Sequence, residues 1–383
     1  MTGQALINAR IFDGYAFGTD RAVIVEGALI KDVVPTDSLP KGLETLDLQG
    51  ATLAPGFIDL QINGCGGVLF NDDISEETLE TMHQTCLRFG CTSFLPTLIT
   101  SPAADFKRAV EVAASYYVKK PWAILGVHLE GPFISQIKRG THNDRYIRPL
   151  DMETVDFLCQ WVKKVPIVLT AAPEENDPQL LRRLALAGVR LSLGHTNATY
   201  EEALAGIANG MHTATHLFNA MSAFDRNNPG AVGAVLNSSV YTGLIVDGMH
   251  SSFHTANLVK KIKGERVYIV TDAVTPMGTD MKEFRFADQR VLVVDGKCIN
   301  EHGGLAGSNI TMIASVRNAV LQAGIDEAEA LKMATLYPAA MMGVEVSIGG
   351  IRPGMAANLI AYDRNFNLTA FSFCGMLQQL AIL

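Results

Sequence analysis

From residue 57 onward the chain alternates short apolar runs with segments in which apolar residues recur every three to four positions. Short apolar runs are typical of buried parallel strands, and the longer spacing is typical of helices that cover a sheet. The strand-like runs cover residues 57–63, 91–97, 123–130, 166–172, 189–195, 212–216, 241–246 and 267–271, and the helix-like segments cover 76–89, 103–117, 152–162, 178–187, 198–209, 253–262, 308–322 and 327–336. Eight strand–helix units over about 290 residues predict a (β/α)8 barrel, the TIM-like architecture of the α/β class.

The two ends of the chain show strand patterns without a helical period. Strand-like runs at 5–12, 22–25 and 28–34 are separated by turns, and strand character returns at 358–362 and 366–369. We therefore expect a small β-sandwich domain built from residues 1–54 and 346–383, with the barrel domain of residues 55–345 inserted between them. Alternating runs at 283–286 and 291–294 predict a hairpin after the eighth barrel strand.

Composition narrows the class of protein further. The chain has 383 residues, 48% hydrophobic and 18% charged, which is enough to bury a barrel-sized core. The net charge of −8 is dispersed and includes no basic block, which argues against nucleic-acid and anionic-membrane binding. The six cysteines form no CxxC pair, and neither a signal peptide nor an apolar run of about 20 residues is apparent. We expect a cytoplasmic protein with reduced thiols.

Two histidines occupy equivalent places in the barrel pattern. His195 ends the run 189–194 and His216 ends the run 212–215, with a helix-like segment between them. Parallel strands joined in this way bring both imidazoles to the same rim, where α/β folds place their chemistry. Two neutral imidazoles on that rim suit a divalent metal ion. The alternative is one packed and one exposed histidine with no common role.

A carboxylate on the third strand completes this candidate site. Glu130 ends that strand before a Gly-Pro turn, so its side chain is expected on the rim that carries His195 and His216. Alone it would be an ordinary loop charge. Beside two imidazoles it becomes the third ligand of a site with positions open for water, as catalytic metal sites require. His128 should lie one layer deeper, either supporting the site or as a hydrogen-bonded core histidine.

Asp272 follows the eighth strand and is expected at the same rim. A metal lowers the pKa of its bound water from about 15.7 to roughly 7. A neighbouring carboxylate can then remove the proton and pass it to a leaving amine. We predict this catalytic role for Asp272; the alternative is an aspartate that merely caps a following helix.

This ordered set of residues resembles the amidohydrolase superfamily and, within it, the N-acetylglucosamine-6-phosphate deacetylases. The resemblance runs from about residue 5 to residue 370 and rests on PGFIDLQING at 55–64, LEGP at 129–132, GTHN at 140–143, GHTNA at 194–198, THLFNAM at 215–221, DGMH at 247–250, TDA at 271–273 and LAGS at 305–308. It implies hydrolysis of the acetamide of N-acetyl-D-glucosamine 6-phosphate to D-glucosamine 6-phosphate and acetate, in amino-sugar catabolism and cell-wall sugar recycling.

One departure from the superfamily bears on the number of metal ions. Many members carry His-x-His at the end of the first strand and hold two metals, whereas this chain has Gln61 and Asn63 there. Amides are poor substitutes for imidazoles at a transition-metal site. We predict one tightly held divalent ion on Glu130, His195 and His216, with zinc preferred over iron, manganese or cobalt. Gln61 and Asn63 are expected to orient a water.

The resemblance also implies which residues hold the substrate. His142, beside Thr141, is implied to help the metal polarise the acetyl carbonyl, and Arg226 to reach the phosphate of a neighbouring subunit in a homodimer. The other implied substrate contacts are His250 to sugar or phosphate oxygens, Asn219 and Ala220 to the phosphate, and Leu305, Ala306 and Gly307 near the acetyl group. The alternative interpretation, made without the resemblance, is that His142 is a surface loop histidine and Arg226 a solvated loop charge.

Two other functions fit the same pattern. The same fold could act on another N-acetyl amino sugar or on a cyclic amide, and indifference to a substrate phosphate would favour that reading. A non-catalytic metal-binding barrel is disfavoured because it gives Asp272 and the open ligand position no purpose. Residues 370–383 are more apolar than the closing strand of the family, and predict a buried strand, a helical tail or a poorly ordered end.

Overall fold

The computed structural model describes residues 3–380 and contains a barrel of eight parallel strands. In chain order these are β8 (Phe57–Ile62), β11 (Cys91–Ile99), β12 (Val127–Glu130), β13 (Ile167–Ala171), β14 (Arg190–Leu193), β15 (Met211–Ala214), β16 (Tyr241–Leu244) and β17 (Val267–Ile269). Past the end of β17, Asp272 N–H donates to the Gln61 carbonyl at 2.9 Å, and Ile62 pairs with Ala273 in a parallel bridge. These contacts nearly close the ring, so the predicted TIM-like barrel is confirmed.

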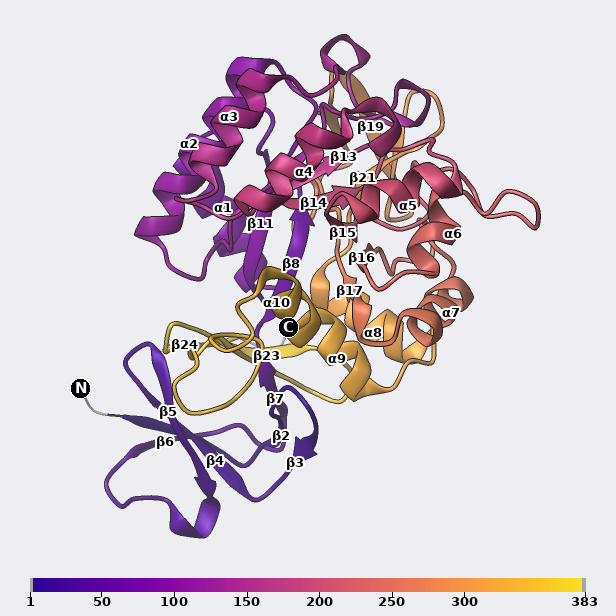
Figure 1. Ribbon diagram of the computed structural model, residues 1–383. Helices are drawn as coiled ribbons and strands as arrows, with labels where there is room; N and C mark the ends of the chain where they lie inside the picture. The colour runs from indigo at the N-terminus through magenta and orange to yellow at the C-terminus, as the bar shows by residue number, and fades with distance from the viewer. Residues whose placement is uncertain (1–2, 381–383) are drawn as a thin grey trace.

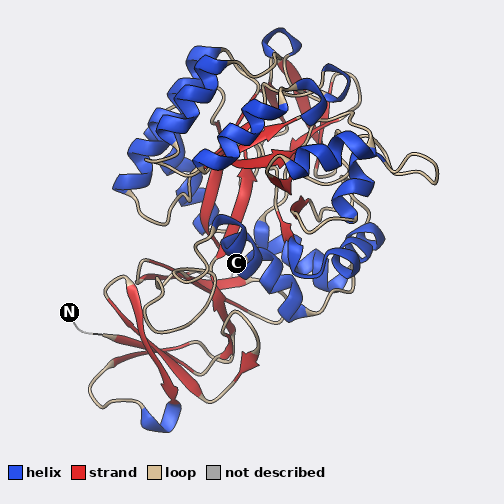
Figure 2. Cartoon of the chain, in the orientation of Figure 1, coloured by secondary structure: helices blue, strands red, loops and turns tan. Residues whose placement is uncertain are grey.

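Helices follow the barrel strands and cover the outside of the ring (Figures 1 and 2). They are α1 (Glu76–Leu87), α2 (Ala103–Lys119), α3 (Met152–Trp161), α4 (Pro178–Ala187), α5 (Tyr200–Ala208), α6 (Gly230–Leu236), α7 (Phe253–Lys263) and α8 (Met312–Leu321). Several begin at a side chain that caps the first turn: Ser75 accepts from Thr78 N–H, and Thr199 and Glu202 form a capping box. No helix within residues 3–380 is long and apolar enough to cross a membrane.

The third barrel strand is shorter than the sequence predicts. It begins at Val127 instead of residue 123, because Trp122 and Gly126 have positive φ angles of 72° and 144° and the chain turns between them. Two further helices, α9 (Glu327–Ala334) and α10 (Leu336–Met342), pack against β8 and β17. The helix predicted over 327–336 is α9, which ends two residues earlier, and α10 begins after the break at Thr335 and was not predicted.

Both chain ends build two small sheets beside the barrel (Figure 1). One contains β1 (Gln4–Ile7), β4 (Arg21–Glu26), β5 (Leu29–Pro35) and β6 (Glu44–Asp47). The other runs in the order β24 (Met376–Gln379), β23 (Leu368–Phe373), β22 (Leu359–Tyr362), β7 (Thr52–Pro55), β2 (Arg10–Phe12) and β3 (Phe17–Gly18). Leu6, Val23, Leu53 and Leu359 belong to one buried apolar cluster that joins the two sheets. The prediction that both ends contribute to one small β unit is confirmed.

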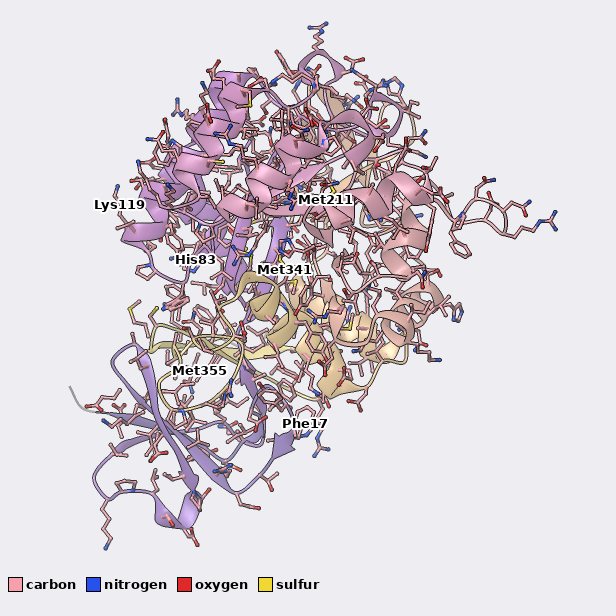
Figure 3. All side chains as sticks on the ribbon, viewed as in Figure 1. Phe17, His83, Lys119, Met211, Met341 and Met355 are labelled. Atoms are coloured by element: carbon pink, nitrogen blue, oxygen red, sulfur yellow. The ribbon has the colours of Figure 1, made fainter. Side chains whose placement is uncertain are left out.

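The apolar C-terminal stretch forms an edge hairpin as far as residue 380, and residues 381–383 lie outside the described chain. Strand β23 begins at Leu368 instead of residue 366, because Phe366 adopts a left-handed turn conformation with φ of 63°. The ring of Phe373 packs edge-on against His83 of α1, with centroids 4.5 Å apart, which joins the small sheet to the barrel. His83 is labelled in Figure 3. Burial lowers the pKa of His83 to about 4, so this imidazole is neutral at pH 7.

An antiparallel sheet is inserted between β17 and α8. Strands β18 (Glu283–Phe286) and β19 (Gln289–Val294) form the predicted hairpin, and β20 (Lys297–Asn300) and β21 (Leu305–Ser308) extend it to four strands. Helix α8 therefore begins at Met312, capped by Thr311, and not at residue 308 as predicted. A separate apolar cluster containing Phe284, Phe286 and Ile99 fixes this sheet against the rim of the barrel.

Candidate active site

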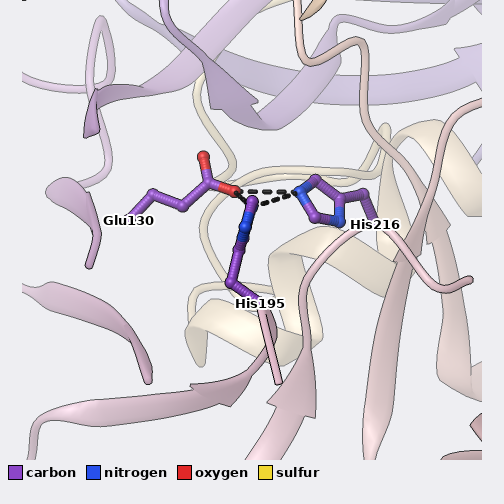
Figure 4. A group of neighbouring side chains, drawn as sticks. All are labelled: Glu130, His195 and His216. Atoms are coloured by element: carbon purple, nitrogen blue, oxygen red, sulfur yellow. Dashed lines mark hydrogen bonds and ion pairs between the residues drawn. The ribbon is translucent and has the colours of Figure 1, made fainter. Parts of the chain in front are cut away.

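Three strand ends bring Glu130, His195 and His216 together. Glu130 ends β12, and the two histidines follow β14 and β15. Glu130 Oε1 lies 3.0 Å from His195 Nε2 and 2.9 Å from His216 Nε2, and the two Nε2 atoms are 3.2 Å apart (Figure 4). All three side chains are buried. The structure therefore brings into contact the three residues that the sequence pattern predicted on one rim.

The spacing of these three atoms fits a shared divalent ion. Metal–ligand bonds of about 2.0–2.1 Å at tetrahedral angles separate ligand atoms by about 3.3 Å, close to the spacing found here. Two imidazole nitrogens and one carboxylate oxygen also form a common ligand set for catalytic metals. Within residues 3–380 this is the one group of three or more histidine, cysteine or acidic side chains whose ligand atoms all lie within 4.8 Å of one another.

Contacts behind the triad orient its ligand atoms. His195 Nδ1 donates to the Lys138 carbonyl at 2.9 Å, which leaves the Nε2 lone pair directed at the centre of the triad. Gln61 Nε2 donates to Glu130 Oε2 at 3.2 Å. Burial opposes ionisation of Glu130, but the two histidines outweigh it and hold the pKa of Glu130 well below its usual value. The carboxylate is therefore charged and available as a ligand.

Backbone strain is concentrated at these strand ends. His195, His216 and Asp272 have φ angles of 47°, 27° and 51°, in the left-handed region that non-glycine residues seldom adopt. Such conformations cost of order 1–3 kcal/mol each and persist where the surrounding structure enforces them, often at functional sites. All three of these residues line the same cavity.

Asp272 lies in the same cavity and is held by two amides. Its Oδ1 accepts from Asn63 Nδ2 at 2.7 Å and from Gln61 Nε2 at 3.1 Å. The next residue, Ala273, pairs with neighbouring strands, so the helix-capping alternative is wrong. Burial, together with repulsion from Glu130, raises the pKa of Asp272 to about 6. A carboxyl group with that pKa can accept and return a proton near neutral pH.

His142 reaches the cavity from the loop after β12 and is buried, not a surface residue. Its Nδ1 accepts from the Thr100 hydroxyl at 2.8 Å and from Thr100 N–H at 3.4 Å, so the ring proton is on Nε2. Burial and the nearby His195 lower the pKa of His142 well below its usual value. The side chain is thus a neutral imidazole with an N–H to donate. Sequence reasoning missed Thr100, whose only signal is its place just past a barrel strand.

Most of the other predicted substrate residues line the same cavity, namely Thr141, Asn219, Ala220, His250, Leu305 and Gly307. Ala306 does not line it, because its side chain is fully buried in the cluster beneath the inserted sheet. Asn219 Nδ2 already donates to the carbonyls of His216 and Leu217. Its Oδ1 is therefore the atom that remains for a substrate, and an acceptor suits a sugar hydroxyl better than a phosphate.

His250 is oriented by an aspartate that the sequence reasoning did not single out. Asp247 Oδ2 accepts from His250 Nδ1 at 2.6 Å, while Asp247 Oδ1 accepts the backbone N–H groups of Met249 and His250. This double anchorage fixes the ring and leaves His250 Nε2 as the nitrogen for an external partner. The DGMH segment is thus one structural unit in which Asp247 positions His250.

Arg226 lies away from the cavity of its own chain. It belongs to six consecutive exposed residues, 223–228, in the loop between β15 and α6 that projects from the molecule (Figure 1). Asp225 Oδ1 accepts the N–H groups of Asn227 and Asn228 and shapes the tip of this arm. Phe224 on the same arm is 60% exposed. Both side chains are therefore exposed to solvent in this subunit.

His128 is a core residue. Its Nδ1 lies 3.1 Å from Thr97 Oγ1 and its Nε2 lies 2.7 Å from Thr170 Oγ1 inside the barrel. Both ring nitrogens are therefore satisfied by neighbouring strands, one layer below Glu130. This is the hydrogen-bonded core histidine that the sequence left as one of two readings.

Comparison with known proteins gives matches over nearly the whole chain. Residues 52–379 match the profile of the Amidohydrolase family, and residues 4–53 match that of the NagA composite domain. The chain is 43% identical to the N-acetylglucosamine-6-phosphate deacetylase of Haemophilus influenzae over 367 residues, which cover 95% of this chain and 96% of that protein. The matched profile spans the barrel strands and every residue of the cavity.

Two further similarities bear on fold and substrate. The crystal structure of N-acetylglucosamine-6-phosphate deacetylase from Pasteurella multocida matches with a TM-score of 0.97 at 43% sequence identity, over 99% of this chain and 100% of that one. The N-acetylgalactosamine-6-phosphate deacetylase of Shewanella sp. is 36% identical over 333 residues, covering 86% of this chain and 84% of that protein. The chain is thus similar both to relatives named for N-acetylglucosamine 6-phosphate and to a relative named for its 4-epimer, N-acetylgalactosamine 6-phosphate.

Proposed function

The chain belongs to the amidohydrolase family, and on that premise we propose that it hydrolyses the acetamide of N-acetyl-D-glucosamine 6-phosphate to D-glucosamine 6-phosphate and acetate. The proposal rests above all on the meeting of Glu130, His195, His216 and Asp272 in one buried cavity. The 43% identical relatives support the choice of substrate. The reaction belongs to amino-sugar catabolism and cell-wall sugar recycling, and the six free thiols favour the cytoplasm as its location.

One divalent ion per subunit would be held by Glu130 Oε1, His195 Nε2 and His216 Nε2. Zinc suits this mixed nitrogen and oxygen set best, with iron, manganese and cobalt as alternatives. Such an ion, when bound, polarises a carbonyl and lowers the pKa of water. A second tightly bound ion is not expected, because Gln61 and Asn63 already donate their amide hydrogens to Asp272.

Two residues around the ion have different roles in amide hydrolysis: His142 stabilises the oxyanion and Asp272 transfers the proton. His142 Nε2–H donates to the acetyl oxygen as negative charge develops there, which favours the transition state over the substrate. Asp272 accepts a proton from the attacking water, whose oxygen bonds to the carbonyl carbon. It then gives that proton to the nitrogen as the C–N bond breaks, so acetate and the free amine leave. Because Asn63 and Gln61 hold Asp272 Oδ1, we assign the proton to Oδ2.

The remaining groups would hold the sugar phosphate. His250, fixed by Asp247, and the backbone N–H of Ala220 are assigned to the phosphate, and Asn219 Oδ1 and Thr141 to sugar hydroxyls. Gly307 lines the cavity at a position where the surrounding protein leaves no room for a side chain. Its φ is 69°, and an added Cβ would lie 2.5 Å from Val274 Cγ1.

A substrate comparison tests the proposed function. Acetate release should be at least about a hundredfold more efficient, as kcat/KM, for the 6-phosphate than for unphosphorylated N-acetylglucosamine, since charge-assisted hydrogen bonds contribute about 1.5–3 kcal/mol each. Equal efficiency would instead support a deacetylase of another amino sugar or a cyclic amidase. The 4-epimer N-acetylgalactosamine 6-phosphate belongs in the same assay, because a relative named for that sugar is 36% identical. A higher kcat/KM for the 4-epimer would replace the proposed substrate.

We assign the exposed arm at 223–228 to the active site of a second subunit. Arg226 is exposed and lies outside its own cavity, and Phe224 beside it offers an apolar contact. A guanidinium delivered across a two-fold interface would pair with the substrate phosphate. The enzyme is then a homodimer in which each arm completes the site of its partner.

Replacing Arg226 with alanine should raise KM for the phosphorylated substrate about ten- to hundredfold, because one charge-assisted contact is lost. Arg182→Ala, at an exposed position on α4, is the matched control and should leave KM unchanged. The sharper test mixes Arg226→Ala with Asp272→Asn subunits at substrate concentrations below KM. A mixed dimer has one site with both native residues, so mixing should restore activity if the arginine acts in trans. No restoration would place Arg226 outside the partner's site.

A further inference from the structure

We propose that Ile99 and Phe286 form the wall that receives the methyl of the acetyl group, and that they set the length of the acyl group the enzyme removes. The inference rests on the proposed deacetylase function and adds a determinant of its specificity. Among the residues that line the cavity, Ile99, Phe286 and Leu305 are the large apolar ones within the described chain. A methyl group gains free energy only against apolar surface, so it must face these side chains.

Ile99 lies next to the groups that bind the carbonyl. It ends β11 in register with the metal-ligand candidate Glu130 on β12. It also immediately precedes Thr100, which holds His142 Nδ1. Because side chains alternate along a strand, Ile99 faces the same side as Thr97, whose hydroxyl contacts His128 inside the barrel. Since the carbonyl oxygen and the methyl share one carbon atom, a carbonyl oxygen that accepts from His142 Nε2–H beside the Glu130 site brings its methyl toward Ile99.

This part of the wall is held rigidly in place. Asn71 Oδ1 accepts from Ile99 N–H at 3.1 Å, and Asn71 Nδ2 donates to the Ile99 carbonyl at 3.2 Å. The same amide nitrogen donates to Ser101 Oγ at 2.9 Å. Asn71 therefore fixes both backbone groups of Ile99, so the side chain cannot retreat by moving the strand end.

Phe286 closes the wall from the inserted sheet and is backed by a buried apolar cluster. It ends β18 at the hairpin turn, two residues before Asp288, which accepts from Asn143 Nδ2 at 3.2 Å. Ile99 and Phe286 belong to one buried cluster with Val274, Val291 and other apolar side chains. Because this cluster fills the space behind the wall, a longer acyl chain meets packed atoms instead of a cavity.

The test measures kcat/KM for the N-acetyl, N-propionyl and N-butyryl forms of glucosamine 6-phosphate. Wild-type enzyme should reject the N-butyryl form, because an excess methylene changes selectivity by about 10–200-fold. Ile99→Ala removes side-chain volume at the wall and should raise the ratio of N-butyryl to N-acetyl efficiency by about tenfold or more. Phe286→Leu and the milder Ile99→Val should raise the N-propionyl ratio, and they retain an apolar core if the alanine variant does not fold.

Val155→Ala is the matched control, because Val155 on α3 is fully buried but belongs to neither the cavity nor the cluster behind Phe286. It should leave every acyl ratio at the wild-type value. Unchanged ratios in the Ile99 and Phe286 variants, or an equal shift in Val155→Ala, would overturn the assignment of the wall. Failure of wild-type enzyme to release acetate from the N-acetyl form would instead refute the proposed function, so the two failures are distinguishable.

Discussion

Replacing Asp272 with asparagine should lower kcat for acetate release about 10²–10⁴-fold, the range expected when a positioned acid–base group is lost. Asparagine has nearly the same shape, and its oxygen can still accept from Asn63 and Gln61. The cavity should therefore keep its form and its metal ion. The measurements are steady-state kinetics together with elemental analysis of the purified variant, with Asp156→Asn, at an exposed ion pair, as the control.

The pH profile separates loss of the proton carrier from general damage. Burial raises the pKa of Asp272 to about 6, and the positive charge of a bound ion would lower it again. Wild-type kcat/KM should therefore fall as pH drops through the lowered pKa of Asp272, at a pH below about 6, because the protonated carboxyl cannot accept a proton from water. The residual activity of the asparagine variant should lack this acidic limb. Near wild-type turnover in that variant would remove Asp272 from the mechanism.

Removing the metal ion should abolish acetate release and also destabilise the fold. A ligand that binds only the folded state, at about 1,000 times its Kd, contributes about 4 kcal/mol. With an unfolding entropy of about 2.1 cal/mol/K per residue, a chain of this size should lose about 5 °C in Tm. Dialysis against a chelator followed by thermal unfolding measures the shift. Adding back Zn²⁺, Mn²⁺, Fe²⁺ or Co²⁺ in turn identifies the ions that restore activity.

Single variants show whether the effect arises at the proposed site. His216→Ala should lose both the metal and the activity, because it removes one of the three ligand atoms. His254→Ala, at an exposed histidine on α7, should keep both. Full activity after complete removal of metal, or normal metal content in His216→Ala, would contradict the assignment of the triad.

The sequence predicted the barrel well because its strands are short, mostly apolar runs that alternate with helical patterns. The carboxyl ends of parallel barrel strands all lie on the same rim. Residues at those ends, namely Glu130, His195, His216 and Asp272, could therefore be placed together from the sequence alone. The boundaries were less predictable where backbone conformation decides them. Residue 123 continues the apolar pattern of the third strand, yet the positive φ of Gly126 delays the start of the strand to Val127.

The supporting contacts could not be predicted from the sequence. Thr100 and Asp247 act through hydrogen bonds to a nearby histidine, and threonine or aspartate after a strand has many other uses. Ile99 and Phe286 are separated by almost the whole barrel, and only the inserted sheet brings them into one cluster. Apolar periodicity shows which residues are buried, but it does not show which of them face a cavity.

The interleaving of the two chain ends also affects how the protein is made. Strand β7 lies in the middle of the six-stranded sheet, and three of the strands in that sheet come from residues 359–379. On the ribosome, β2, β3 and β7 emerge early and stay without those partners until the last segment has been synthesised. A chain that stops short of residue 359 would carry every barrel strand and each of the three metal-ligand candidates. It would nevertheless expose the unpaired edge of β7. We therefore expect such a chain to aggregate or to be degraded, although its metal-ligand candidates are all present.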